Sequence, residues 1–130
     1  MKLFRAMREA ADGLPEVGPT ARTLGVRPHP HGNADVAATF PTDLVHPGGG
    51  GASVAPNDPI NLPPLRRPRS LGGTGKDPVW WIESDDLGPD LAFRQQSSIH
   101  GLIEPARTMA LAELDRALAD TRKRWVVHCR

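Results

Sequence analysis

The sequence lacks three features that would each point to a class of protein: paired cysteines, a long hydrophobic run and an excess of one charge. Its single cysteine, Cys129, cannot form an internal disulfide, and no Cys/His spacing is typical of zinc. A reducing compartment is therefore the expected environment. His29, His31 and His46 lack the helical i, i+4 spacing and a paired carboxylate motif, so we expect no metal site.

No stretch is long and apolar enough for a signal peptide or a bilayer span, which predicts a cytoplasmic protein without a membrane partner. Sixteen Lys and Arg residues against fifteen Asp and Glu residues leave a net charge of +1, which does not indicate nucleic-acid binding. The basic cluster Arg66-Arg67-Pro68-Arg69 is more typical of a solvated loop than of a phosphate-binding patch.

Glycine and proline are abundant, with 13 and 14 residues among 130, which predicts a loop-rich protein with few long elements. The length suits one domain, residues 1–130, with one modest core. Alternation and turn signals predict short strands at residues 3–7, 23–27, 53–55, 79–82, 91–96 and 100–105, a helical turn at 8–12, and an amphipathic helix from 110 to about 124. The expected fold class is α+β, with a small, mostly antiparallel sheet and a C-terminal helix packed against it.

Arg5 stands in the first predicted strand, where Leu3, Arg5 and Met7 share one side. If this strand is buried, Arg5 needs an anionic partner, because an unpaired buried charge is very costly. The alternative is that Arg5 lies at a strand edge and reaches solvent.

Two glycine-rich stretches have competing interpretations. The run Gly48-Gly49-Gly50-Gly51, followed by Ala52 and Ser53, fits either a flexible linker or a loop where the backbone closely approaches something else. The second stretch, residues 70–76, superficially resembles a phosphate loop. It lacks the required spacing, and Asp77-Pro78 follows where a helix should begin, so we reject that interpretation.

Four segments together resemble a known family. They are Leu3-Phe4-Arg5-Ala6, Gly50-Gly51-Ala52-Ser53-Val54, residues 89–97 (PDLAFRQQS) and residues 100–109 (HGLIEPARTM). In this order and spacing the set is similar to the bacterial type VI secretion effector toxins that have an ADP-ribosyltransferase-like fold and use NAD. The resemblance implies a split sheet that holds NAD, as substrate, in its gap.

The resemblance also implies a set of NAD-binding residues. Arg5 would match the pyrophosphate or a ribose-phosphate oxygen, since a guanidinium forms charge-assisted bonds with such groups. The backbone of Gly50, Gly51 and Ala52 would approach the nicotinamide carboxamide, and the Ser53 hydroxyl would brace a neighbouring ribose or side chain. Gln95 would orient the ribose or the acceptor.

The implied catalytic residues are Arg5, Ser53, His100 and Glu104. Cleavage of the nicotinamide–ribose bond passes through an oxocarbenium-like state, which a carboxylate that accepts from the ribose 2′-hydroxyl stabilises. Glu104 is the candidate for this role on chemical grounds, and His100 would orient the ribose or the acceptor. If both lie on one strand face, they are roughly 13 Å apart, at opposite ends of a cleft.

Three positions depart from the family's usual residues: Ala52 replaces a threonine, Gln96 an aspartate and Thr108 a proline. The expected function is transfer of ADP-ribose from NAD to an unidentified macromolecule inside a competing cell, with a cognate immunity protein in the producer. The alternatives are an NAD glycohydrolase that uses water as acceptor, and a catalytically inactive interaction module with the same fold.

Overall fold

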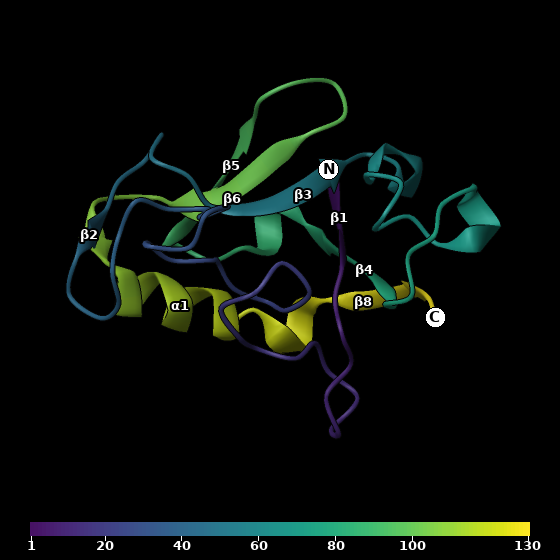
Figure 1. The fold of residues 1–130 in the computed structure, drawn as a ribbon, viewed down its shortest axis with the longest axis horizontal. Coiled ribbons are helices and arrows are strands. Elements are labelled where there is room, and N and C mark those ends of the chain that lie inside the picture. The colour runs from purple at the N-terminus through teal and green to yellow at the C-terminus, as the bar shows by residue number, and fades with distance from the viewer.

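The computed structural model describes residues 1–130, which form mostly short strands joined by long loops (Figure 1). The strands are β1 (Lys2–Ala6), β2 (Leu44–Val45), β3 (Ala52–Pro56), β4 (Val79–Glu83), β5 (Leu91–Gln95), β6 (Gly101–Pro105), β7 (Met109–Ala110) and β8 (Val126–Cys129). The helix α1 (Leu111–Ala119) is accompanied by the single-turn 3-10 helices η1 (Pro59–Asn61), η2 (Arg69–Leu71), η3 (Ser84–Asp86) and η4 (Arg122–Arg124). The predicted α+β class, with a mostly antiparallel sheet and one C-terminal helix, is confirmed, and the strand β8 follows the helix.

Six strands form one antiparallel sheet in the order β5-β6-β3-β1-β4-β8, and β2 pairs with β7 in a small second sheet. The join at the centre of the large sheet is short. β1 and β3 share only the pairs Leu3 with Pro56 and Phe4 with Ala55, and beyond Phe4 they are not paired. The sheet is therefore split into the halves β5-β6-β3 and β1-β4-β8.

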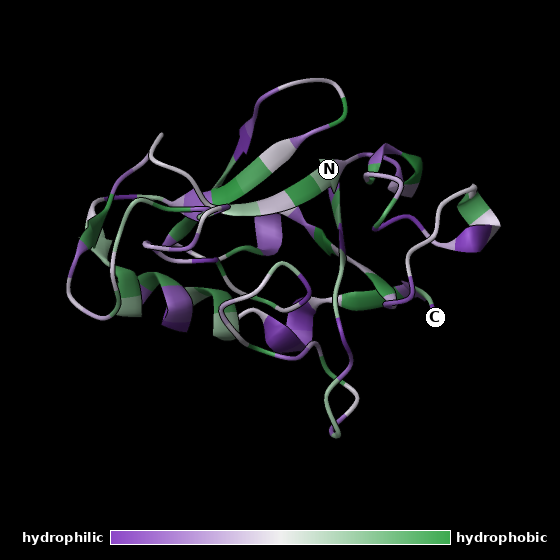
Figure 2. Ribbon diagram, in the orientation of Figure 1, coloured by the Kyte–Doolittle hydropathy of each residue, from purple (hydrophilic) through white to green (hydrophobic).

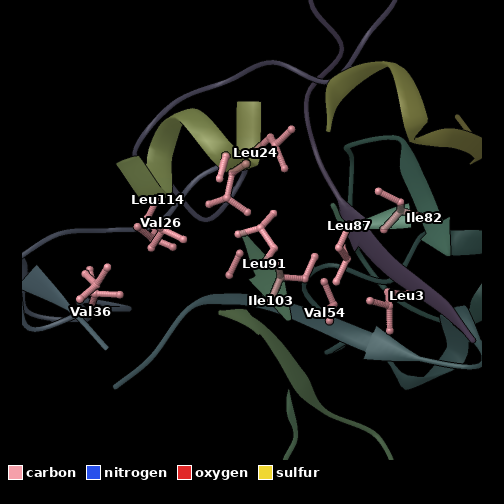
Figure 3. Close-up of a cluster of buried hydrophobic side chains, with 14 of the residues drawn as sticks. Leu3, Leu24, Val26, Val36, Val54, Ile82, Leu87, Leu91, Ile103 and Leu114 are labelled. Carbon is pink, nitrogen blue, oxygen red and sulfur yellow. The ribbon is translucent and has the colours of Figure 1, made fainter. Parts of the chain in front are cut away.

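Strand alternation divides the buried side chains between the two faces of the sheet. On one face, Leu3, Val54, Ile82 and Ile103 pack against α1 and the loops that cover it, as Figure 3 shows. A smaller cluster on the other face contains Phe4, Ala6, Ala55, Leu62 and Val79. Because each central strand is covered on both faces, most of its residues are buried.

The two adjacent tryptophans point to opposite faces, as the strand period requires. Trp80 is buried in the larger cluster, and its indole N–H donates to the Met7 carbonyl over 2.9 Å. Trp81 is half-buried against the smaller cluster, with the Lys2 ammonium 4.2 Å from its ring centre. This arrangement confirms the strand predicted at residues 79–82.

α1 is amphipathic, as the alternation of hydrophobic and hydrophilic colours along it in Figure 2 shows. The predicted helix was too long, because α1 ends at Ala119 rather than near residue 124. The Thr121 hydroxyl donates back to the Leu118 carbonyl over 2.6 Å and accepts the Trp125 indole N–H over 2.9 Å. This local turn brings Trp125 into the core through η4 instead of through a continued helix.

Two predicted elements near the N-terminus were wrong. Residues 8–12 form part of an extended arm closed by a turn, with the Ala10 amide bonded to the Leu14 carbonyl and Glu9 bridged to Pro15, and they contain no helical turn. Residues 23–27 form no strand, and Leu24 makes only one isolated bridge, with Val17. The carbonyls of Thr23 and Gly25 instead accept hydrogen bonds from the side chain of Arg5.

None of the helices has the length and apolar character needed to cross a membrane.

The packing of α1 against the sheet can be tested by replacing Leu114, a fully buried residue of this helix (Figure 3). Leu114→Ala should lower the free energy of unfolding by about 2–5 kcal/mol, since it removes buried methyl groups and leaves a cavity. Leu65→Ala is the matched control, because Leu65 is 79% exposed and should change stability by less than about 0.5 kcal/mol. Urea denaturation measures both, and equal effects would contradict the assignment of the core.

Candidate active site

A cleft of about 530 Å³ opens where β1 and β3 separate. Its lining comes from the end of β1, from β3, from the residues just before β6, and from two loop segments around residues 27–35 and 60–67. The volume lies within the range of roughly 300–1,000 Å³ that is usual for small-molecule sites. The split in the sheet thus produces a cavity of ligand size.

Arg5 fills the inner end of the split. Its Nη1 donates to the Ser53 carbonyl over 2.7 Å, and Nη2 donates to the carbonyls of Thr23 and Gly25 over 2.8 and 3.1 Å. The side chain is 5% exposed, so the solvent-facing alternative is wrong. Burial is the main cause that lowers the pKa of Arg5 to about 10, and the residue keeps its charge at neutral pH.

The expected anionic partner of Arg5 is not in direct contact with it. Backbone carbonyls from β3 and from the 20–25 loop surround the guanidinium instead, and the nearest carboxylate influence is a through-space effect of Asp35. Carbonyl dipoles solvate a buried guanidinium by filling its donor positions, which removes the need for a paired charge. Arg5 therefore holds the loop to the edge of β3.

Ser53 and His100 line the same cleft as Arg5. Both side chains are half-buried, and neither the Ser53 hydroxyl nor the His100 ring has a hydrogen-bond partner within the protein. They come from β3 and from the residue before β6, which pair along the sheet. The structure thus brings together three of the residues that the sequence singled out, with two polar groups free to bind a ligand.

The glycine run is a structural element rather than a flexible linker. Gly50 has φ +115°, and a Cβ there would lie 1.9 Å from the Asp35 carbonyl oxygen. A Cβ on Gly51 would lie 2.2 Å from the Ile103 carbonyl oxygen. The predicted close approach is present, but the backbone approaches other protein backbone. Gly50, Gly51 and Ala52 do not line the cleft, and they fix the start of β3 so that Ser53 does.

The structure does not bring Glu104 or Gln95 into the cleft. The Glu104 carboxylate is 5% exposed, accepts Arg94 Nε over 2.6 Å and accepts the Gly48 amide over 2.7 Å. Glu104 therefore anchors the glycine run, and its part in catalysis stays a prediction. Gln95 is exposed, and its side chain donates to the Ser97 carbonyl over 3.1 Å.

Four further charged residues line the cleft that the sequence did not assign to it: Arg27, Asp35, Arg66 and Arg67. Arg27 holds Asp35 through its Nε and Nη2, at 3.2 and 2.9 Å, and through its backbone amide at 2.7 Å. Arg66 and Arg67 belong to the basic cluster that was interpreted as a solvated loop. The basic cluster was the one feature of the sequence that could have assigned Arg66 and Arg67 to the site. These residues reach the cleft because of how residues 56–75 fold, which the sequence pattern does not show.

A split antiparallel sheet, with an arginine at the split, a serine on the strand across from it and a helix behind, defines an ADP-ribosyltransferase-like fold. The family model of the Tse2 ADP-ribosyltransferase toxin matches residues 2–125. The chain therefore belongs to the Tse2 ADP-ribosyltransferase toxin family, as the resemblance of the four segments predicted. No curated protein and no solved structure matches it.

The carbonyl contacts of Arg5 predict a large stability effect. Arg5→Met should lower the free energy of unfolding by more than about 2 kcal/mol, because several buried carbonyls lose their donor. Arg8→Met, three positions on and about half exposed, is the matched control and should have a small effect. Urea denaturation compares the two, and an Arg5→Met protein as stable as the parent would refute this role.

The loop that Arg5 grips is also tied down by Arg22, which binds the Asp77 carboxylate through two bonds of 2.8 and 2.7 Å. These bonds lower the pKa of Asp77 below its usual value of 3.8. The ionised Asp77 thus stabilises the fold above about pH 4, and this contribution disappears as the pH falls through the folded-state pKa.

Asp77→Asn should consequently reduce the free energy of unfolding at pH 7 and have a smaller effect near pH ~2.5. Denaturation curves at the two pH values measure this difference. Asp86→Asn, at an exposed position without an ion-pair partner, should show no such pH dependence. A gap for Asp77→Asn that stays constant or widens in acid would contradict the prediction.

Proposed function

We propose that this protein binds NAD in the cleft at the split and transfers its ADP-ribose to a macromolecule inside a competing cell. The observation that carries the proposal is the convergence of Arg5, Ser53 and His100 on one cleft from three separate parts of the chain. Membership of an ADP-ribosyltransferase toxin family supports the reaction class.

The reaction breaks the bond between ribose C1′ and the nicotinamide nitrogen, and the bonding electron pair leaves with nicotinamide. An acceptor oxygen or nitrogen then bonds to C1′ and gives up its proton. In this proposal the unpartnered Ser53 hydroxyl and His100 ring hydrogen-bond the nicotinamide riboside part of NAD. Such contacts accelerate the reaction to the extent that they strengthen as positive charge develops on the ribose.

Asp35 is the only carboxylate among the residues that line the cleft. A carboxylate stabilises an oxocarbenium-like state. Asp35 can supply such a carboxylate in the cleft, held by Arg27, whereas the carboxylate of Glu104 is held outside the cleft by Arg94. Its ion pair with Arg27 reduces the negative charge but also fixes the position of the carboxylate. We therefore propose Asp35 as the charge-stabilising group.

The three departures from the family's usual residues do not argue for an inactive protein. Ala52 is buried in the core with its side chain on the face opposite Ser53, so a hydroxyl there would not reach the cleft. Gln96 is exposed outside the cleft, and the Thr108 hydroxyl bonds His46 over 2.9 Å. The cleft is thus unaffected by all three.

The setting of this activity follows from the toxin family. We propose that the protein acts in the cytosol of the target cell after delivery by type VI secretion, and that the producing cell makes a cognate immunity protein. Co-expression tests this part: the toxin alone should stop growth of a bacterial host, and the neighbouring open reading frame should restore it. Harmless expression of a folded protein would contradict it.

Labelled NAD tests the reaction itself. Incubation of the purified protein with adenylate-labelled NAD and a bacterial lysate should give label on protein or nucleic acid together with free nicotinamide. Release of ADP-ribose alone would instead identify a glycohydrolase that uses water as acceptor. No consumption of NAD would overturn both.

Ser53→Ala should lower the rate of NAD consumption by about ten- to a hundredfold, since it removes one hydrogen bond from the cleft. Ser98→Ala, an exposed serine outside the cleft, is the matched control and should retain the parent rate. Circular dichroism and thermal melting should be unchanged in both variants. Because Ser53 makes no side-chain hydrogen bond within the protein, an unchanged rate would exclude it from the site.

A further inference from the structure

The segment that follows β3 folds into a tight turn carrying Arg66 and Arg67, which we call the arginine turn (residues 63–67). The amides of Arg66 and Arg67 both donate to the Pro63 carbonyl over 2.8 Å. Residues 73–75 then bond across the turn, with the Thr74 amide donating to Pro64 over 2.9 Å and the Gly75 amide to Arg67 over 2.8 Å. The backbone of the arginine turn is therefore fixed before any ligand binds.

The glycines that superficially resemble a phosphate loop serve this turn. A Cβ on Gly73 would lie 2.1 Å from the Arg67 carbonyl oxygen and 2.6 Å from that of Pro64. Only glycine allows the returning chain to pass so close to the turn. These glycines therefore shape the turn that carries the two arginines.

Both arginines line the cleft, and both side chains have unused hydrogen-bonding capacity. Arg66 is half-buried, lines the cleft and makes no side-chain hydrogen bond or ion pair. Arg67 donates through Nη1 to the Ile60 carbonyl over 3.0 Å, but its Nε is buried without any partner. It is the only buried side-chain nitrogen or oxygen in the protein left unbonded, and such a group has a substantial desolvation cost.

The charges in the cleft are unbalanced. Four guanidinium groups, those of Arg5, Arg27, Arg66 and Arg67, line it with one carboxylate, Asp35, which Arg27 already holds. Burial is the main cause that lowers the pKa of Arg5, and the positive charges of Arg66 and Arg27, which line the same cleft, lower it further. A ligand with two adjacent negative groups would relieve this repulsion and fill the free donors.

We propose that Arg66 and Arg67 bind the diphosphate of the dinucleotide, and that Arg5 is the structural support of the cleft rather than its phosphate ligand. This inference rests on the proposed function for the identity of the dinucleotide. It places the diphosphate against the arginine turn and leaves the nicotinamide riboside end for Ser53 and His100.

Isothermal titration with inorganic pyrophosphate and with ADP tests the diphosphate site without any bond cleavage. Arg66→Gln should weaken the binding of both by about tenfold, and Arg67→Lys should weaken it by a similar factor because the guanidinium fork is lost. Arg69→Gln is the matched control, since Arg69 is exposed, lies outside the cleft and carries the same charge. It should bind within about twofold of the parent.

A change in folding does not complicate this test. The Arg66 side chain makes no hydrogen bond or ion pair in the free protein, so Arg66→Gln should melt at the parent temperature. Equal pyrophosphate binding by the parent, Arg66→Gln and Arg69→Gln would overturn the inference. Pyrophosphate binding that depends on Arg66, without any consumption of NAD, would retain the diphosphate site and reject the proposed reaction. Consumption of NAD with an unchanged KM in Arg66→Gln would retain the reaction and reject the site.

Discussion

The structure depends on one buried guanidinium surrounded by backbone carbonyls. Arg5 sits where two central strands stop pairing, and it bonds one of them and the covering loop at the same time. Without a donor there, the edge of β3 and the turn at Thr23 would present unsatisfied carbonyls to a dry interior. With it, the split persists as a stable feature, and a cavity can exist at the centre of a sheet that would otherwise close.

Strands could be predicted from the sequence where the pattern of neighbouring residues alone determines the backbone conformation. The apolar and aromatic run at Val79–Glu83 and the alternation of Gly101–Pro105 each have one plausible conformation. The errors lie where a distant side chain decides. Residues 23–27 have strand propensity, but their carbonyls bind Arg5, so no ladder forms. The helix was predicted too long because Trp125 falls on the same helical stripe as Leu114 and Leu118. In the structure, the hydroxyl of Thr121 closes the last turn before Trp125 is reached.

The candidate site was predictable only in part, and for a physical reason. Ser53 and His100 follow from motifs on neighbouring strands, whose pairing fixes their separation. The strand that carries Glu104 was predicted, but the orientation of its carboxylate was not. That orientation depends on bonds from Arg94 and from the Gly48 amide, and the spacing of residues in the sequence does not reveal these contacts. Arg66 and Arg67 were identified as part of a basic cluster but interpreted as a solvated loop, because a net charge of +1 does not show where in the fold the charges gather. A near-neutral protein can still concentrate cations in one cavity.

The arginine turn closes on itself: the backbone hydrogen bonds donated by its residues and by residues 71–75 all end within residues 63–75. The sheet, in contrast, is held by ladders and by Arg5. The residues that hold the sheet together and the residues that we propose bind the ligand therefore lie in separate segments of the chain. Changes in the length or charge of the turn would alter what the cleft accepts without disturbing the strands behind it. A lineage under pressure to change substrate, or to escape a neutralising partner, has in this turn a segment free to evolve.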